Sequence, residues 1–367
     1  MTAIQGKYLT VLLLVSCFIS GAMAQENPMQ FLSRANAKVA KAAALKSKWE
    51  GPVEGPKLQK NKKIVFIASN MNDAGNYGIY TGIKEATVGT GWEVLLIDCR
   101  GLCQGAGIVN QALDMKANGI VLAGVDAASQ AKGIAAAEKA KVPVVGWHAN
   151  VKSGPVEGLF TNVTTNPKDG AQIAALYGVV ESNTKSGIVL FTDSSSPYLT
   201  AKSNAIIEII KQCDSCRLLS VEELPAYEVY KKMPALADAL VKRHGAKWTH
   251  VIGVNDVYFD VMAKPEIAAI LANNKLRGLS AGDGSASAYK RIRANSSQIG
   301  TVPEPLFQHG WQIVDELNRA FSGVAPSNYV TPVHLVTSQN IAYDGGPKNV
   351  FDPDNDFRER YQSYWAK

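Results

Sequence analysis

Short apolar runs alternate with amphipathic stretches along most of the chain, and this alternation predicts its secondary structure. The series begins at residue 64, where apolar runs of strand length are separated by apolar positions at helical spacing. We predict strands at 64–69, 93–98, 119–123 and 142–147, and helices at 78–88, 105–116 and 127–139. Strands this short and apolar are typical of a parallel sheet whose two faces are both covered by helices.

The same alternation then starts again, which predicts a second α/β unit. We expect strands at 158–162, 187–191, 217–221, 250–254 and 276–281, and helices at 167–181, 201–212, 233–243, 257–273 and 285–294. A strand at 299–302, a helix at 306–322 and a strand at 330–336 follow. A helix and a strand after two α/β units indicate that the chain crosses back between two lobes.

The first 24 residues have the pattern of a secretory signal peptide. A positive start precedes the apolar stretch 8–20, and Ala22-Met23-Ala24 forms a small-x-small cleavage site. A second interpretation is a lipoprotein box at Leu14–Cys17, with Cys17 lipidated after cleavage. We favour cleavage after Ala24, because apolar residues continue past Cys17. Either route predicts a periplasmic protein, and no later apolar run approaches the roughly 18 residues of a membrane helix.

A basic extension, residues 25–63, precedes the α/β units. It predicts an amphipathic helix at 28–49 and a Pro/Gly linker at 51–56. Its nine basic and three acidic residues account for the formal net charge of +6, so the remaining body is near neutral. Nucleic-acid binding needs a basic face on the folded domain, and we predict none. The charged, aromatic tail 344–367 is expected to pack on the surface.

Four cysteines remain after cleavage, and they form two close pairs, Cys99 with Cys103 and Cys213 with Cys216. An exported protein favours two local disulfides. The alternatives are free thiols, a zinc site, which the distance between the pairs in the chain disfavours, and a redox motif. A redox Cys-x-x-Cys normally opens a helix, whereas Cys213 follows a predicted one. The five histidines lack metal-ligand spacing, so we predict no metal and no cofactor.

Five segments resemble periplasmic sugar-binding proteins of ABC importers, of the ribose- and galactose-binding type. Three of them look like the first lobe of this family, and the last two look like the turns of its second lobe that place Asn and Asp at the sugar. The segments are Ile64–Asn70, Gly119–Gly124, Val142–His148, Gly253–Asp256 and Leu279–Gly284. The order and spacing of these segments hold from about Ile64 to about Tyr343.

The resemblance implies the type I periplasmic binding protein fold, with two doubly wound, Rossmann-like lobes joined by a three-strand hinge. The N-terminal lobe would comprise 64–162 and about 302–329, and the C-terminal lobe 163–301 and about 330–343. The crossovers are expected near Asn162, Thr301 and Tyr329. Ligands of open α/β sheets bind beyond the carboxyl ends of the strands, so a small polar ligand would lie between the lobes.

Residues just after the strand ends are therefore the candidates for ligand contacts. A sugar needs carboxylates and amides for its hydroxyls and aromatic rings for its C–H faces. The resemblance implies ligand contacts at Asn255 and Asp283, whereas Asp256 would cap the next helix. A turn residue is the alternative for Asp283. Lys202 lies roughly where the family carries an Arg, and Lys lacks the planar fork of that side chain.

The predicted site departs from the family in the first lobe. The Asp-Arg pair of the family falls on His148 and Ala149 in this chain. We expect His148 to bind a ligand hydroxyl and Trp147 to stack on the sugar ring. The alternative is a structural His148 and a Trp147 in the core. In place of the paired aromatics of the ribose type, the chain has Asp73-Ala74-Gly75-Asn76-Tyr77. Tyr77 would serve as the platform, with Asp73 or Asn76 as polar partner.

Two further candidates complete the predicted site. Tyr227 could enter the cleft from the second lobe, and surface packing is its alternative. Glu304 lies at a predicted hinge, where relatives often carry Gln, and the prolines on either side would stiffen it.

These features predict a binding protein and not an enzyme. The chain would act as a monomer that captures a monosaccharide or similar polyhydroxylated ligand and delivers it to an ABC permease. A sensory protein that presents the ligand to a chemoreceptor or sensor kinase would have the same fold. An exported hydrolase is the minor alternative, because Gly278–Gly282 matches Gly-x-Ser-x-Gly. Ser280, however, lies inside a predicted strand and not on a sharp turn before a helix.

Overall fold

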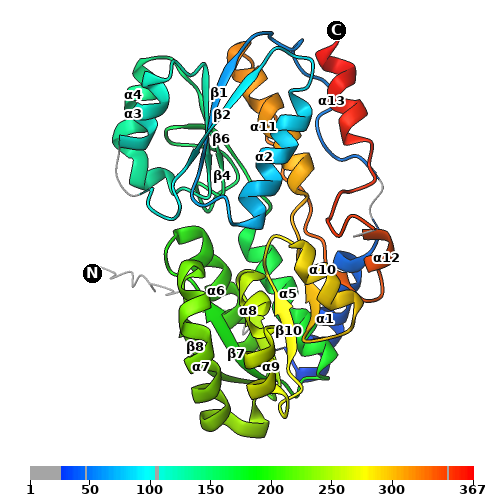
Figure 1. Ribbon diagram of the computed structural model, residues 1–367. Coiled ribbons are helices and arrows are strands. Elements are labelled where there is room, and N and C mark those ends of the chain that lie inside the picture. Colours follow the sequence, from blue (N-terminus) through cyan, green and yellow to red (C-terminus); the bar gives the residue numbers. More distant parts are fainter. Residues whose placement is uncertain (1–25, 46–47, 104–106, 345–346) are drawn as a thin grey trace, which may run out of the picture.

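Two α/β lobes, each built on a six-stranded sheet, form the body of the molecule (Figure 1). The computed structural model describes residues 26–45, 48–103, 107–344 and 347–367. The predicted signal peptide and the lipoprotein box at Cys17 lie outside the described residues. In the part of the chain that is described, no helix combines the length and apolar character needed to cross a membrane.

The sheet of the first lobe has the strand order β2-β1-β3-β4-β6-β5, with only β5 antiparallel to its neighbour. β3 is buried along its whole length, and β1 along all but its first residue, because helices cover both faces of the sheet. The strands are β1 (Lys63–Ala68), β2 (Glu93–Asp98), β3 (Gly119–Ala123), β4 (Val144–Trp147), β5 (Gly154–Val156) and β6 (Leu159–Val163). The helices are α2 (Ala74–Ala86), α3 (Gly107–Asp114), η1 (Ala127–Gln130), α4 (Ala131–Lys139) and α11 (Leu306–Phe321).

The sheet of the second lobe has the order β12-β11-β10-β9-β7-β8, with only β12 antiparallel. Its strands are β7 (Gly187–Thr192), β8 (Arg217–Glu223), β9 (His250–Gly253), β10 (Arg277–Ser280), β11 (Gln298–Thr301) and β12 (Val336–Thr337). Its helices are α5 (Pro167–Glu181), α6 (Pro197–Lys211), η2 (Ala226–Glu228), α7 (Val229–His244), η3 (Gly245–Lys247), α8 (Val257–Met262), α9 (Pro265–Leu271), α10 (Ala286–Arg293) and α12 (Ile341–Asp344).

Most predicted elements are present, and the differences have local causes. The helix expected at 257–273 is divided into α8 and α9, because Pro265 cannot continue a helix and starts a new one. The strand expected at 330–336 pairs only at β12, after a segment that contains Pro332. β5 was not predicted, since its three residues show no apolar alternation. The structure pairs Cys99 with Cys103 and Cys213 with Cys216, as predicted.

The chain passes between the two lobes at three points within the α/β body. It leaves the first sheet after β6 and enters α5, returns after β11 to α11, and crosses again from α11 to β12. Capping side chains define where two helices of the second lobe, α5 and α6, begin. The side chains of Asn166 and Ser196 accept hydrogen bonds from backbone N–H groups in the first turns of α5 and α6, and each helix has Pro at its first position.

The N-terminal extension connects both lobes. α1 (Pro28–Ala43) packs on α5 of the second lobe, where the backbone N–H of Leu335 donates to the carbonyl of Ala42. The following segment reaches the first lobe, where the backbone N–H of Gln59 donates to the side chain of Asn318 on α11. The predicted basic helix is therefore docked on the body, and it ends earlier than expected.

The C-terminal tail is not a surface appendage, so that expectation is wrong. α13 (Phe357–Trp365) lies beside α11 (Figure 1). Its aromatic side chains recur at helical spacing and enter the core of the first lobe, where the ring of Trp365 stacks on that of Trp311 with centroids 5.4 Å apart. The indole N–H of Trp365 also donates to Asp315 over 2.9 Å. The charged residues between the aromatic positions had obscured this apolar stripe.

We expect Trp365→Ala to lower the free energy of unfolding by about 3–5 kcal/mol, because it opens a cavity in the first-lobe core and removes one of the donors to the buried carboxylate of Asp315. Urea unfolding of the mature protein measures this loss. The control is Tyr343→Ala on α12, whose side chain is 76% exposed and whose loss should change stability by less than about 0.5 kcal/mol. Equal effects of the two substitutions would contradict a core role for α13.

Candidate functional site

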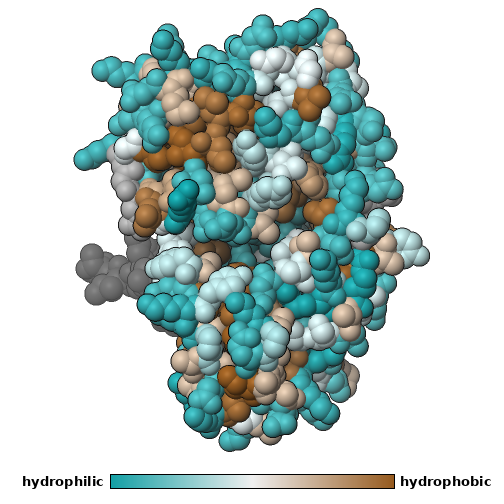
Figure 2. Space-filling model, viewed as in Figure 1, coloured by the Kyte–Doolittle hydropathy of each residue, from teal (hydrophilic) through white to brown (hydrophobic). Residues whose placement is uncertain are grey.

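Loops at the carboxyl ends of both sheets meet at the boundary between the lobes, in a region that we call the interlobe site. The loop before α2 in the first lobe faces the loops after β9 and β10 in the second, and the amide of Asn255 lies 3.5 Å from Oδ2 of both Asp73 and Asp283. Figure 2 shows one face of the molecule, on which side chains of the two lobes meet across the boundary. Most of this face is polar, and the larger apolar areas lie on the first lobe. The lobes are thus in mutual contact.

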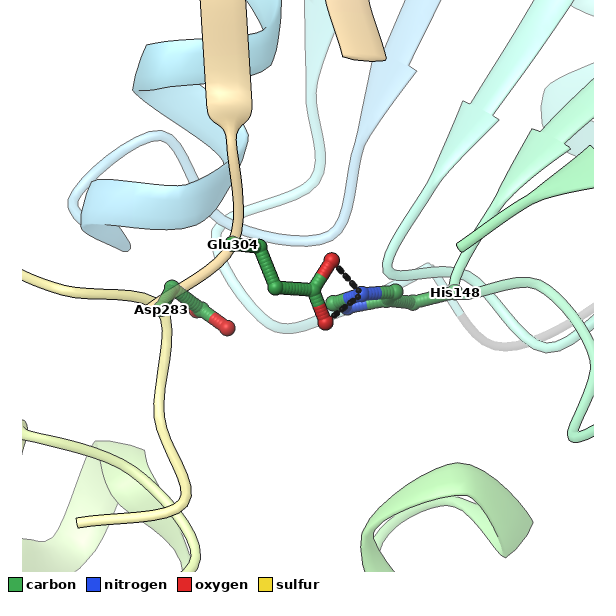
Figure 3. A group of neighbouring side chains, drawn as sticks. All are labelled: His148, Asp283 and Glu304. Carbon is green, nitrogen blue, oxygen red and sulfur yellow. Dashed lines mark hydrogen bonds and ion pairs between the residues drawn. The ribbon is translucent and has the colours of Figure 1, made fainter. Parts of the chain in front are cut away.

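Glu304 is the centre of this site. It lies in the passage from β11 to α11, and its side chain is buried among groups from both lobes (Figure 3). Nε2 of His148, just after β4, lies 2.9 Å from each carboxylate oxygen. The hydroxyl of Tyr198, from α6 of the second lobe, donates to Oε1 over 2.8 Å. One carboxylate thus joins the first lobe, the second lobe and the passage between them.

Aromatic rings fix the imidazole of His148. It stacks between Trp147 and Tyr198, with centroid separations of 3.7 and 4.0 Å and interplanar angles of 19°. Its backbone has φ of +53°, a left-handed conformation that a residue with a Cβ rarely adopts. Such a conformation persists only where the surroundings enforce it. Nζ of Lys202 lies 4.8 Å from the centroid of the Tyr198 ring and donates to the carbonyl of Ala281.

Hydrogen-bond partners and burial set the protonation of the two histidines. The indole N–H of Trp147 donates to Nδ1 of His309, so this nitrogen carries a lone pair and the Nε2–H donates to Thr331. Burial lowers the pKa of His309 to about 4. Burial also lowers the pKa of His148, and it outweighs the opposite effect of Glu304. For Glu304, burial raises the pKa, but His148, His309 and Lys202 together outweigh it and lower the pKa to about 2. At neutral pH a neutral His148 therefore donates to an ionised Glu304.

Two carboxylates face each other across the lobes. Asp73 caps α2 by accepting from the backbone N–H of Asn76, and Asp283 follows β10. Burial raises the pKa of Asp283 well above its usual range, and the nearby Asp73 raises it further. Burial raises the pKa of Asp73 too. Closing the lobes therefore places like charges close together, with only the amide of Asn255 between them.

Other predicted residues have different positions. Asn76 is buried, and its amide donates to Ser69 and Asn70 within its own loop. Tyr77 and Tyr227 are 61% and 70% exposed, so neither ring is enclosed between the lobes in this closed arrangement. Their roles as ligand contacts stay predictions.

Asp256 corrects one expectation, because its side chain makes no hydrogen bond that caps α8. It is buried and instead accepts from the backbone N–H groups of Gly284 and Ser285 and from the side chains of Gln298 and Thr301. These bonds hold the loop that carries Asp283. Asn255 makes the local turn, since its Oδ1 accepts from the N–H of Val257.

Tyr198 and His309 were missed as site residues. Tyr198 is the second residue of α6 and follows the end of β7 by only a few residues. Its position after a strand end is therefore the sequence signal that marked the other candidates. His309 lies one helical turn into α11, among other buried polar residues such as Gln312 and Glu316, so no signal in the sequence marked it. Sequence alone could not show that both converge on Glu304.

The site also brings together groups that could hold a cation. His148, Asp283 and Glu304 each offer one ligand atom, and these atoms lie within 4.8 Å of one another (Figure 3). Such donors suit a divalent metal ion. The imidazole and the Glu304 carboxylate are, however, engaged with each other in the closed site. Ser280 lies in β10 and its Oγ accepts from the N–H of Gly282, so it does not form a hydrolase elbow.

Comparisons with known proteins agree with this architecture. The model of the periplasmic binding protein domain family matches residues 64–323, and the chain belongs to this family. Its structural neighbours are sugar-binding periplasmic proteins of ABC transporters with the type I fold, which confirms the predicted fold class. No curated protein matches the sequence.

Three solved structures illustrate the likeness. A sugar ABC transporter protein from Yersinia enterocolitica has a TM-score of 0.69 at 16% identity, covering 83% of this chain and 96% of its own. A solute-binding protein from Mycobacterium smegmatis with bound glycerol has a TM-score of 0.66 at 17% identity, covering 79% and 99%. The arabinose-binding component from Shewanella sp. ANA-3, bound to L-arabinofuranose, has a TM-score of 0.66 at 13% identity, covering 82% and 96%.

The buried histidines predict a pH-dependent stability. Between pH about 6.5 and about 4 the unfolded chain binds protons at His309 that the native state excludes, so the contribution of His309 to the free energy of unfolding falls as the pH falls through this window. At about 1.4 kcal/mol per pKa unit, the loss is on the order of 3 kcal/mol, and His148 adds to it in the same direction.

Urea unfolding at pH 7, 6, 5 and 4 measures this slope. His309→Gln should flatten it, because Gln can accept from Trp147 and donate to Thr331 without titrating. The control is His244→Gln, on α7 outside the interlobe site, which should leave the slope as it is. A slope that His309→Gln leaves unchanged would contradict the assignment of the neutral ring.

Lobe closure predicts an effect at Gly75, in the first turn of α2. A Cβ at this position would lie 2.6 Å from Oδ2 of Asp283 and 2.7 Å from the ring of Trp147. We therefore expect Gly75→Ala to hold the lobes apart and to increase amide hydrogen exchange several-fold in residues 70–80 and 281–290. Gly107→Ala is the control, because its Cβ would meet nothing within 4 Å. Unchanged exchange in both segments would contradict the closed contact.

Proposed function

We propose that this chain is an exported solute-binding protein that captures a small polyhydroxylated ligand in the interlobe site and delivers it to an ABC permease. The observation that carries the proposal is the convergence of buried and half-buried polar side chains from both lobes and from a passage between them. Asp73 belongs to the first lobe, Asn255 and Asp283 to the second, and Glu304 to the passage. A ligand held by all of them would bind only when the lobes close.

The chemistry of these groups suits hydroxyls. Ionised carboxylates accept hydrogen bonds and an amide both donates and accepts, while each hydroxyl of a polyol can do either. The amide of Asn255 reaches both carboxylates only at 3.5 Å, the long limit for a hydrogen bond. Ligand hydroxyls placed between Asn255 and the two carboxylates could form shorter hydrogen bonds than the 3.5 Å contacts that these side chains make with each other.

Membership of the family and the ligands of its structural neighbours support the same class. The Mycobacterium protein holds glycerol and the Shewanella protein holds L-arabinofuranose, both polyhydroxylated compounds. The sequence pattern of the first 24 residues supports export to the periplasm. The ABC transporters to which these neighbours belong support the proposed delivery to a permease.

A thermal-shift screen of the refolded, ligand-stripped mature protein tests the proposal. The probes are pentoses, hexoses, sugar alcohols and amino acids. A ligand at a hundred times its dissociation constant stabilises the native state by about 2.7 kcal/mol, which raises the melting temperature by several degrees. We expect a shift with one group of sugars or sugar alcohols.

Variants locate the binding. Asn255→Ala should remove most of the shift, because it deletes the amide between the two carboxylates. Asn36→Ala, on the exposed face of α1, is the matched control and should retain the shift. A shift with amino acids alone would overturn the polyol assignment, and a shift that Asn255→Ala preserves would place the ligand elsewhere.

A further inference from the structure

The interlobe site holds more negative than positive charge. Three carboxylates, those of Asp73, Asp283 and Glu304, influence one another electrostatically in the closed site. Lys202 is the cation whose charge acts on all three of them. His148 and His309 are neutral at neutral pH, because burial lowers the pKa of both, and Nδ1 of His309 accepts from the indole of Trp147. With all three carboxylates ionised, this set of groups carries an excess of two negative charges.

Lys202 does not neutralise the facing pair. Its ammonium donates to the carbonyl of Ala281 over 2.7 Å and lies over the ring of Tyr198. Among the described residues, no Lys, Arg or His side chain forms an ion pair with Asp73 or Asp283. Asp283 is 7% exposed, and its contact with Asn255 at 3.5 Å is the only side-chain hydrogen bond described for it.

Closure of the lobes therefore has an electrostatic cost that a neutral ligand does not remove. Two like charges in a site shielded from water repel each other more strongly than they would in solution. Protonation of one of the two carboxylates would relieve this repulsion. A positively charged group of the ligand at the same place would offset the repulsion without protonation.

We propose, building on the proposed function, that the polyhydroxylated ligand also carries a protonated amine, which lies between Asp73 and Asp283 when the lobes close. An ammonium group offers three donors and no acceptor, which complements carboxylates that only accept. The hydroxyls of the ligand would contact Asn255 and Glu304. The substrate class is then amino sugars or amino alcohols with several hydroxyls, and not neutral sugars.

Matched pairs of probes separate the charge from the shape of the ligand. The first pair is 1-amino-1-deoxy-D-sorbitol and D-sorbitol; the second is D-glucosamine and D-glucose. N-acetyl-D-glucosamine keeps the nitrogen of glucosamine but loses its charge. Isothermal titration of the ligand-stripped protein at pH 7 gives each dissociation constant. We expect the amine of at least one pair to bind at least tenfold more tightly than its neutral partner, because charge-assisted hydrogen bonds exceed neutral ones.

Two variants test the position of the amine. Asp283→Asn keeps the size and the acceptor of the side chain but removes its charge, and it should reduce the preference for the amine at least tenfold. Asp73→Asn should act in the same way, and it retains the cap of α2, since Asn caps helices as well as Asp. It serves as the second test if Asp283→Asn does not fold. Asp238→Asn, at an exposed position on α7, is the control and should keep the preference.

The outcomes separate this inference from the proposed function. If D-sorbitol and D-glucose both bind as tightly as their amines, the inference is overturned and the polyol-binding function stands. If both variants keep the full preference, the ammonium lies elsewhere and the inference fails. If no sugar, alcohol or amine binds the folded protein, the proposed function fails as well. Binding of Zn²⁺ or Ca²⁺ that depends on Asp283, with no response to amines, would also overturn the inference.

Discussion

The buried carboxylate of Glu304 is the interaction on which the closed arrangement depends. It lies in a passage between the lobes and accepts hydrogen bonds from His148 of the first lobe and Tyr198 of the second. Pro303 and Pro305 restrict the backbone on either side of it. A buried ionised group without donors is costly, so these three residues hold one another in place. The relative position of the lobes, and with it the distance between Asp73 and Asp283, follows from this network.

Helix α1 with the segment that follows it, and helix α13, pack on the side of the molecule where the chain passes between the lobes. α1 packs on the second lobe and α13 on the first, and the segment after α1 runs from one lobe to the other. The ring of Trp49 in this segment contacts Tyr329, in the passage from α11 to β12, and Tyr361 of α13, with centroids 5.5 and 5.4 Å apart. If the lobes open, these N-terminal and C-terminal segments therefore have to move as well.

The alternation of apolar runs was sufficient to predict two α/β lobes, because buried parallel strands leave a strong local signal in sequence. The resemblance and the strand ends also identified Asp283, Asn255 and Glu304 as residues of one region. The pattern could not predict that Tyr198 and His309 converge on Glu304. Tyr198 and Glu304 are more than 100 residues apart in the sequence, and the contact between His309 and Glu304 depends on how α11 is placed. It also misjudged α13, where charges between the aromatic positions concealed a buried face.

Small-angle X-ray scattering shows whether the lobes close when a ligand binds. The ligand-stripped mature protein would be measured alone and with a saturating concentration of the compound that gives the largest thermal shift. We expect the radius of gyration to decrease on binding, and the bound scattering profile to match that calculated for the closed arrangement described here. An identical radius of gyration with and without a ligand that demonstrably binds would contradict the account of two lobes closing around it.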